Sequence, residues 1–264
     1  MLISESSGNI RIGNHTFRKD FIVIAGPCAI ESREQMEEIA EELILRKVFF
    51  LRAAPYKPRT SPHSFQGLGE EGLAIIRELK AKYPLHVVGE IVDSRDLPVY
   101  NDLFDIIQVG ARNMQNFELL KALGKAKRPV LLKRGFGSTV EEWLHAAEYL
   151  HKYGNREVIL CERGIRTFEP QTRNTLDLSS IVLARNHTEL PVVVDPSHAA
   201  GRRDLIASLS FAAVAAGADG LLLEVQVDPD SAWSDARQTI SFSEFDRILQ
   251  VLKKLAPLFG KKCD

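Results

Sequence analysis

Residues 21–51 read FIVIAGPCAIESREQMEEIAEELILRKVFFL and contain the unit from which the whole fold is built. Two short apolar runs, at 21–24 and 48–51, flank a segment from Ser32 to Arg46 in which apolar residues recur with the period of a helix. A strand that is apolar on both faces is typical of a parallel sheet covered by helices, because neither face then meets water. The stretch therefore predicts a strand–helix–strand unit with parallel strands.

The same alternation continues to the end of the chain. Six more apolar runs follow, at 87–90, 105–109, 130–132, 158–160, 192–194 and 221–223. Helix-period segments lie between them, at 71–83, 94–103, 139–153, 177–186, 204–216 and 243–255. The segment 94–103 is the weakest, because Pro98 interrupts it. Eight strand–helix units in 264 residues predict an α/β fold of the (β/α)₈ TIM-barrel type rather than an open sheet.

The region before the first strand is too short to form a domain of its own. We expect residues 1–20 to be an N-terminal extension in which residues 9–17 form a small hairpin that covers one end of the barrel. Residues 21–264 are expected to form a single catalytic barrel, since no linker or low-complexity segment divides them.

Composition and charge exclude several classes of protein. The formal net charge of −1 gives no excess of positive charge of the kind that binds nucleic acid or an anionic membrane. No apolar run approaches the roughly 18 residues that a membrane-spanning helix needs. The three cysteines, Cys28, Cys161 and Cys263, are too few and too widely spaced for a disulfide framework. We therefore expect a cytoplasmic protein, where cysteines stay reduced.

Functional side chains of such a barrel lie at the carboxyl ends of the strands. Every predicted strand is followed by a residue that can coordinate a metal, titrate or bind an anion. In chain order these residues are Cys28, Arg52, Glu90, Arg112, Lys133, Arg163, His198 and Glu224. No single member of the series would be persuasive, but its regularity is hard to obtain by chance.

Three members of the series converge in a closed barrel. Cys28, His198 and Glu224 follow the first, seventh and eighth strands, which become neighbours on closure, and Asp235 in the loop after the eighth strand supplies a fourth candidate ligand. A buried cysteine alone is more often a small apolar residue than a ligand. Together, a thiolate, an imidazole and two carboxylates favour a borderline divalent metal such as Mn²⁺, Fe²⁺, Co²⁺ or Zn²⁺.

The cations form a second group. Five positive charges facing one cavity require a polyanionic ligand, because unpaired buried charge is costly. These residues are Arg52, Lys57, Arg112, Lys133 and Arg163. A substrate with both a phosphate and a carboxylate fits, since arginine binds each with two parallel hydrogen bonds. Lys133 leaves another interpretation open, in which it forms a Schiff base as in the barrel aldolases.

Taken together, these motifs resemble the 3-deoxy-D-arabino-heptulosonate 7-phosphate (DAHP) synthase family in its shorter form, which is close to 3-deoxy-octulosonate 8-phosphate (KDO8P) synthase. The resemblance covers the chain from Phe21 to the last predicted helix. Its most specific pieces are AGPCAIES (25–32), KPRTSP (57–62), SFQG (64–67), QVGARN (108–113), LLKRG (131–135), LCERG (160–164) and DPSH (195–198).

The resemblance implies a metal-dependent transferase that condenses phosphoenolpyruvate with erythrose 4-phosphate and water. The products are DAHP and phosphate, in the first step of the shikimate pathway to aromatic amino acids. It implies a divalent metal cofactor (Mn, Fe, Co or Zn) held by Cys28, His198, Glu224 and Asp235. We also expect a homo-oligomer, either a dimer or a tetramer.

The resemblance also implies roles for the basic residues. Phosphoenolpyruvate would be held by Arg52, Lys57, Arg112, Lys133 and Arg163. The phosphate of erythrose 4-phosphate would contact Arg59 and Thr60. The catalytic candidates are Lys57, Glu90 and Lys133, with Glu90 handling the protons of the water that adds to phosphoenolpyruvate.

Two alternatives stay open beside the Schiff-base aldolase. The first is KDO8P synthase, which uses arabinose 5-phosphate; that group resembles Lys-Ala-Asn-Arg-Ser-Ser where this chain has residues 57–62, and the contrast favours the four-carbon sugar. The second is a non-catalytic barrel that binds metal or phosphate, which the full series of strand-end groups disfavours.

The chain departs from the family pattern at Ala53-Ala54, where glycines are common, and at Gln226, where histidine is common. The first change is expected to narrow the phosphoenolpyruvate pocket, and the second to remove a partner of a metal ligand.

Overall fold

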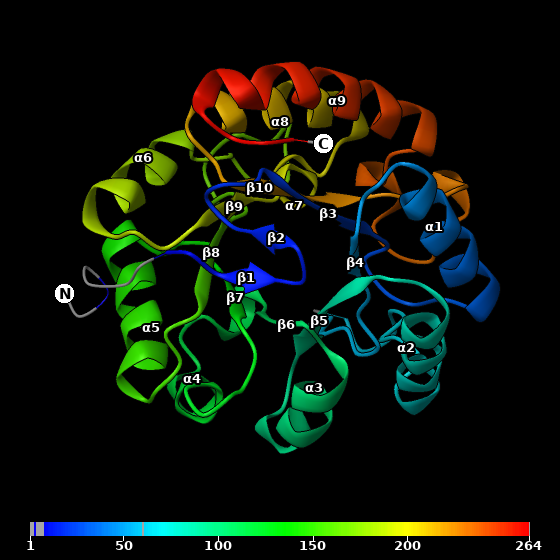
Figure 1. Cartoon of the computed structure of the whole chain (residues 1–264), viewed down its shortest axis with the longest axis horizontal. Helices are drawn as coiled ribbons and strands as arrows, with labels where there is room; N and C mark the ends of the chain where they lie inside the picture. The colour runs from blue at the N-terminus through cyan, green and yellow to red at the C-terminus, as the bar shows by residue number, and fades with distance from the viewer. Residues whose placement is uncertain (1–2, 4–7, 60, 264) are drawn as a thin grey trace.

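Eight parallel strands form a closed barrel in the computed structural model, which describes residues 3, 8–59 and 61–263 (Figure 1). The strands follow one another around the ring in chain order, and the last pairs with the first. They are β3 (Ile22–Gly26), β4 (Phe50–Arg52), β5 (His86–Ile91), β6 (Ile106–Val109), β7 (Val130–Lys133), β8 (Val158–Glu162), β9 (Val192–Val194) and β10 (Gly220–Glu224). The predicted (β/α)₈ barrel is confirmed.

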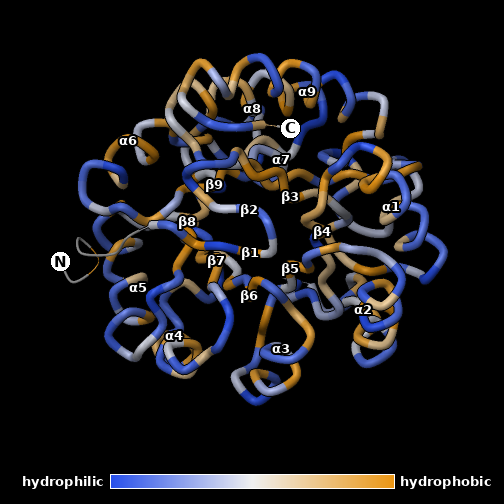
Figure 2. The backbone as a smooth tube through the Cα atoms, in the orientation of Figure 1, coloured by the Kyte–Doolittle hydropathy of each residue, from blue (hydrophilic) through white to orange (hydrophobic). Residues whose placement is uncertain are grey.

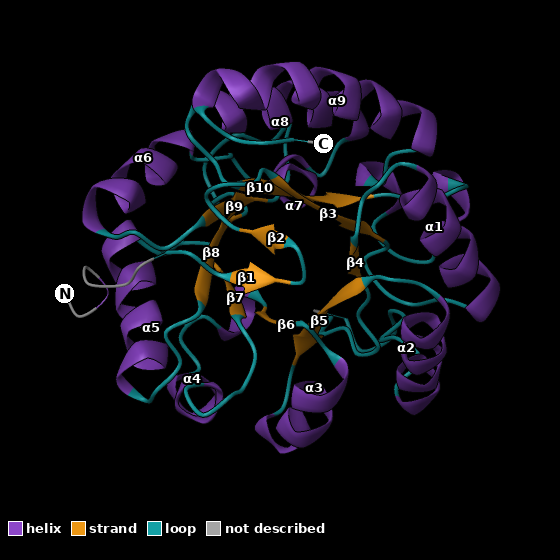
Figure 3. Cartoon of the chain, in the orientation of Figure 1, coloured by secondary structure: helices purple, strands orange, loops and turns teal. Residues whose placement is uncertain are grey.

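Helices surround the ring on the outside (Figure 3). They are α1 (Arg33–Leu45), α2 (Glu70–Lys82), α3 (Leu97–Leu103), α4 (Phe117–Leu123), α5 (Val140–Lys152), α6 (Leu178–His187), α8 (Ile206–Ala215) and α9 (Phe242–Leu255). The short helix α7 (Pro196–Ala200) directly follows β9 and lies beside β10, inside this outer layer (Figure 3). Several helices begin where a hydroxyl side chain accepts a hydrogen bond from the first turn, as Ser32 does for α1 and Thr139 for α5. The short helices α4 and α7 add to those predicted.

The segment 94–103 differs in detail from its prediction. A 3₁₀ turn, Ser94–Asp96, precedes α3, and Pro98 lies in the first turn of that helix. A proline there removes an N–H group that has no partner within the helix, and its fixed φ suits a helix start. Pro98 therefore begins this helix instead of interrupting it.

The predicted N-terminal hairpin is present and closes one end of the barrel. Its strands, β1 (Arg11–Ile12) and β2 (His15–Thr16), pair antiparallel and lie across the opening of the ring (Figure 1). Ile10, Ile12 and Phe17 are buried and belong to the same apolar cluster as inward-facing strand residues such as Ile24 and Leu131. The ring strands themselves are mainly hydrophobic (Figure 2). Together with the hairpin they form an apolar core at the covered end of the barrel. The carboxyl ends of the strands, at the other end, carry the polar groups.

None of the helices in the described part of the chain has the length and apolar character needed to span a bilayer.

Candidate active site

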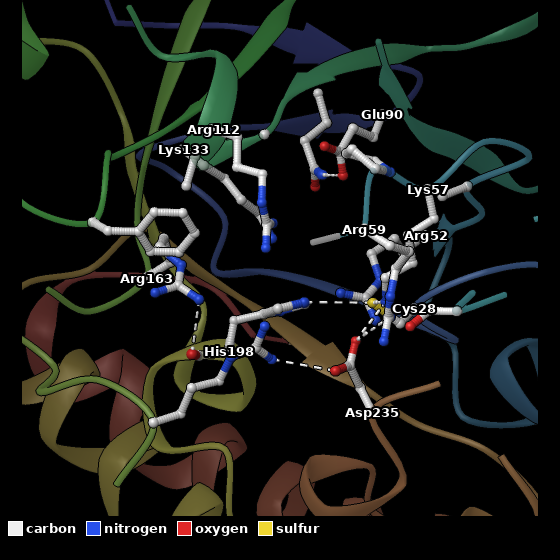
Figure 4. A pocket seen from close by; sticks show the side chains of 18 of the residues that line it. Cys28, Arg52, Lys57, Arg59, Glu90, Arg112, Lys133, Arg163, His198 and Asp235 are labelled. Atoms are coloured by element: carbon white, nitrogen blue, oxygen red, sulfur yellow. Dashed lines mark hydrogen bonds and ion pairs between the residues drawn. The ribbon is translucent and has the colours of Figure 1, made fainter. Parts of the chain in front are cut away.

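A cavity of about 240 Å³ lies at the carboxyl ends of the strands, and charged side chains from around the ring point into it (Figure 4). Most of the residues predicted from the sequence line it. They are Cys28, Arg52, Lys57, Arg59, Glu90, Arg112, Lys133, Arg163, His198 and Asp235. Glu224 lies behind the surface of the cavity and is fully buried, and Thr60 is outside the described residues. Ala54 also lines the cavity, so the departure from the glycine pattern falls within the pocket.

Four potential metal ligands meet on one side of this cavity. The donor atoms of Cys28, His198, Glu224 and Asp235 all lie within 4.8 Å of one another. His198 Nε2 is 3.4 Å from Cys28 Sγ and 3.0 Å from Glu224 Oε1. These residues meet because the barrel is closed: β10 pairs with both β3 and β9, which brings three strand ends together.

The donor set suits a divalent metal. Burial lowers the pKa of His198 to about 4, which keeps the imidazole neutral, as a metal ligand must be. Burial, with the Glu224 charge beside it, raises the pKa of the Cys28 thiol, and a bound divalent cation would reverse this effect. Glu224 Oε1 is buried and faces the other candidate ligands, with His198 Nε2 and Arg52 Nη2 each 3.0 Å away. The residues therefore fit a metal such as those predicted.

Asp235 is surrounded by cations. Its Oδ2 lies 2.5 Å from Lys57 Nζ and 3.6 Å from Arg59 Nη1, and its Oδ1 is 3.2 Å from Arg173 Nη1. Burial alone would raise the pKa of Asp235, but the positive charge of Lys57 and the hydrogen bonds from Lys57 and Cys28 together hold the pKa well below its usual range. Lys57 Nζ also contacts Cys28 Sγ, so this lysine stands among the metal-ligand candidates as well as at the cavity surface.

Asp195 links the metal-ligand group to the basic side of the cavity. Its carboxylate is fully buried, with Oδ2 2.8 Å from His198 Nδ1 and 2.6 Å from Lys133 Nζ. A carboxylate in this position orients the imidazole, which then presents Nε2 to the other ligands. Sequence reasoning did not select Asp195, although it is the first residue after β9 and so carried the same strand-end signal as its neighbours.

The basic side of the cavity is organised around an aromatic ring. The Arg163 guanidinium lies 4.8 Å from the centre of the Phe136 ring, and that of Arg112 lies 5.3 Å from it. Arg163 also donates hydrogen bonds to the carbonyl oxygens of His198 and Gly164. Figure 4 shows Arg163 on the same side of the cavity as Arg112 and Lys133. Like-charged guanidinium groups can approach one another here because each faces the negative π-cloud.

Phe136 and Arg173 were both missed from the sequence. Each lies in a loop beyond a strand end, where no periodic pattern marks a residue that will face the cavity. Arg173 reaches the site through Asp235 Oδ1 and through Gln238 Oε1, which is 3.1 Å from its Nη1.

Arg52 is almost fully buried and makes structural contacts besides lining the cavity. It is 3% exposed, and its guanidinium donates to the carbonyl oxygens of Gly26 and Pro27. Its Nη2 lies 3.0 Å from Glu224 Oε1. Arg52 therefore supports the loop of Cys28 and the Glu224 carboxylate while one face of it lines the cavity.

Glu90 stands on the opposite side from the metal-ligand group (Figure 4). Gln108 Nε2 donates a 3.0 Å hydrogen bond to its Oε2. A side chain at Gly110 would come within 2.0 Å of its Oε1, so only glycine leaves room for the carboxylate. Burial raises the pKa of Glu90, although Lys133 and Lys57 act against that rise. A carboxylate with a raised pKa is suited to exchange protons with a bound substrate or water.

Lys133, the alternative Schiff-base residue, is engaged elsewhere. Its Nζ forms the 2.6 Å ion pair with Asp195, and both side chains are almost fully buried. An amine that attacks a carbonyl must present a free lone pair, whereas this nitrogen is held as the cationic partner of a carboxylate. The geometry therefore favours a role in anion binding.

Comparison with known proteins gives a family for this architecture. A family model described as DAHP synthetase I matches residues 2–260. A phospho-2-dehydro-3-deoxyheptonate aldolase from Thermotoga maritima is 51% identical over 255 residues, which cover 97% of this chain and 74% of that protein. A 2-dehydro-3-deoxyphosphooctonate aldolase from Bartonella henselae is 30% identical, over 98% of this chain and 99% of that protein.

Solved structures agree with the sequence relatives. The crystal structure of the Thermotoga maritima DAHP synthase superposes with a TM-score of 0.94 at 50% identity, covering 98% of this chain and 76% of that chain. A truncated form of the same enzyme superposes with a TM-score of 0.90 at 46% identity, covering 98% and 95%. The chain belongs to the DAHP synthetase I family.

Proposed function

We propose that the mouth of this barrel condenses phosphoenolpyruvate with erythrose 4-phosphate and water, giving DAHP and phosphate in the first step of the shikimate pathway. Membership of the family makes the chain a carbon–carbon bond-forming transferase of the DAHP synthase type. One observation supports this reaction: the metal-ligand candidates and a group of basic side chains line the same small cavity. The 51% identity to a heptonate enzyme, against 30% to an octonate enzyme, favours the four-carbon sugar.

Cys28, His198, Glu224 and Asp235 would hold one divalent metal ion. Their mixed sulfur, nitrogen and oxygen donors suit Mn²⁺, Fe²⁺, Co²⁺ or Zn²⁺. When bound, such an ion acts as a Lewis acid toward the aldehyde oxygen of the sugar phosphate. Asp195 keeps the His198 ring in the orientation that this role needs.

Phosphoenolpyruvate binds to the cations on the other side of the cavity. Arg112, Lys133 and Arg163 receive its phosphate and carboxylate, and Arg52 and Lys57 approach from the side of the metal ligands. C3 of phosphoenolpyruvate attacks the aldehyde carbon, and positive charge develops at C2. The same cations stabilise the phosphate as it leaves, because they are already oriented and need no rearrangement.

Glu90 takes a proton from the water that adds at C2. Its raised pKa and its place in the cavity support this assignment. Lys57 and Lys133 are the neighbouring catalytic candidates, since each carries a proton on a nitrogen that lines the cavity.

The sugar phosphate binds beside residues 57–64. Arg59, Ser61 and Ser64 line that part of the cavity and offer a guanidinium and two hydroxyl groups to a phosphate. Thr60, which lies outside the described residues, completes the assignment made from the sequence.

Residues 21–264 form the catalytic barrel, with residues 1–20 as an extension that includes the hairpin. The protein acts as a homo-oligomer, in keeping with its family. It works in the cytoplasm, where the free thiol of Cys28 stays reduced.

The decisive experiment mixes the protein with phosphoenolpyruvate and one sugar phosphate at a time, with and without EDTA. Loss of phosphoenolpyruvate absorbance is expected with erythrose 4-phosphate alone and is expected to stop when the metal is removed. Turnover with arabinose 5-phosphate instead would overturn the choice of sugar. Trapping of a substrate adduct on Lys133 by borohydride would overturn the metal-dependent mechanism.

A further inference from the structure

Glu31 is a buried carboxylate near the cavity for which the reaction gives no role. It is 8% exposed and lies three residues after Cys28, in the loop between β3 and α1. Its own backbone N–H donates to Gln35 Oε1, which fixes the main chain at this point. Burying a carboxylate is costly unless donors satisfy it, so the groups around it indicate what it does.

The donors to Glu31 come from the long loop between β10 and α9. The backbone N–H of Trp233 donates to Glu31 Oε1 at 2.9 Å. The backbone N–H of Ser234 and the side-chain amide of Gln226, which is 4% exposed, also lie near this carboxylate and lower its pKa, against the rise that burial causes. Gln226 lies two residues after Glu224, and Ser234 immediately precedes Asp235.

Asp235 needs such support because of its backbone. Its φ of 57° lies in the left-handed region, which aspartate tolerates better than most residues but still at a cost. On its C-terminal side the backbone N–H of Gln238 donates to the Asp235 carbonyl at 3.1 Å. On its N-terminal side the two preceding residues are held by Glu31. The backbone of Asp235 is therefore held in place by contacts on both sides of the residue.

We propose that Glu31 is a positioning residue for the metal site, which fastens the Asp235 loop to the Cys28 loop and thereby sets the affinity for the metal. The inference rests on the proposed metal-dependent function. One carboxylate joins the segments that carry Cys28, Glu224 and Asp235, three of the four candidate ligands. Gln226 thus contributes to this contact through Glu31.

Glutamate is required chemically. The Trp233 N–H and the neighbouring donors act on a carboxylate, which has two acceptor oxygens and no donor when it is ionised. The substitution Glu31→Gln replaces one acceptor oxygen by an NH₂ group and removes the charge. The contact with the Asp235 loop is therefore weakened with almost no change in side-chain volume.

The test measures metal binding directly. Co²⁺ is titrated into the metal-free protein, and the sulfur-to-cobalt absorption reports the Cys28 thiolate while calorimetry gives the Kd. Glu31→Gln is expected to raise the Kd for Co²⁺ by ~10–100-fold, with the saturated spectrum unchanged. The matched control is Glu34→Gln, an exposed glutamate in the first turn of α1, which is expected to leave the Kd unchanged.

The outcomes separate the inference from a general effect on stability. A lower melting temperature of metal-free Glu31→Gln with an unchanged Kd would overturn it. If Glu31→Gln does not fold, Gln226→Leu carries the test: a ~3–10-fold weaker affinity supports the inference and an unchanged affinity overturns it. Failure of the unsubstituted protein to bind Co²⁺ would overturn the proposed metal site, and this inference with it.

Discussion

The two ends of the barrel are built on the same eight strands but hold opposite kinds of side chain. At the end covered by the hairpin, Ile10, Ile12 and Phe17 complete an apolar core inside the ring. At the other end, ten charged or coordinating groups predicted from the sequence surround a cavity of about 240 Å³. The first end gains stability from burial, whereas the second must accommodate buried charge.

The difference shows how the fold accommodates its active site. At the open end the buried charges form pairs that cross between strands, as in Arg52–Glu224, Lys133–Asp195 and Lys57–Asp235. Such pairs offset the cost of removing charge from water, but they add little net stability. Substitutions at the open end should therefore change activity, and those at the closed end should change stability.

The largest effect on activity is expected for Cys28→Ala. Loss of the thiolate leaves an incomplete ligand set, and metal-dependent turnover should fall by ~10³-fold or more. The measurements are bound metal and consumption of phosphoenolpyruvate. Cys263→Ala, at a cysteine far from the cavity lining, is the control and should keep both. Full activity of Cys28→Ala would contradict a metal-dependent mechanism.

The next largest effect is expected for Glu90→Gln, which should lower kcat by ~10²–10⁴-fold. In the proposed mechanism Glu90 acts as a base and must be deprotonated, so activity should rise with pH through its titration. Because burial raises the pKa of Glu90, the midpoint of this rise should lie above the usual range for glutamate. The pH dependence of kcat/KM checks this: the acidic limb should disappear in the variant. Its persistence unchanged would show that another group titrates.

A smaller effect is expected for Arg163→Lys. Lysine keeps the charge but loses the two-pronged hydrogen bonding and the packing on Phe136, so the KM for phosphoenolpyruvate should rise by ~10–100-fold. Steady-state kinetics measure this. Arg163 also donates to the His198 carbonyl, so Co²⁺ affinity should weaken much less than the KM rises. Arg156→Lys, an exposed position, is the matched control. A loss of Co²⁺ affinity as large as the rise in KM would contradict the division of the cavity into a metal side and a substrate side.

The smallest effect on activity is expected at the closed end. Phe17→Ala removes a fully buried ring and should lower the free energy of unfolding by ~3–5 kcal/mol. Denaturant titration measures that loss, while kcat and KM of the folded variant should stay the same at 25 °C. A large fall in kcat would mean that the two ends of the barrel are coupled.

Much of the site could be predicted because every strand of the barrel ends at the same side, so the residues that follow the strands in the sequence lie close together. Each apolar run marks a strand, and the polar residue after it marks a strand end, as Cys28, Glu90 and Lys133 illustrate. The neighbouring positions of the first, seventh and eighth strands follow from closure alone. Pro98 was misjudged because a proline costs little in the first turn of a helix, and the pattern does not show where that turn begins.

The barrel, the hairpin, the series of strand-end groups and the resemblance to the DAHP synthases follow from the sequence alone, because these depend on local periodicity and on short motifs. Which groups touch depends on the tertiary structure. It placed Lys57 between Cys28 and Asp235, put Asp195 behind His198, and fastened the Asp235 loop to Glu31. These contacts join loops that have no periodic pattern, so their partners depend on how the chain packs in three dimensions.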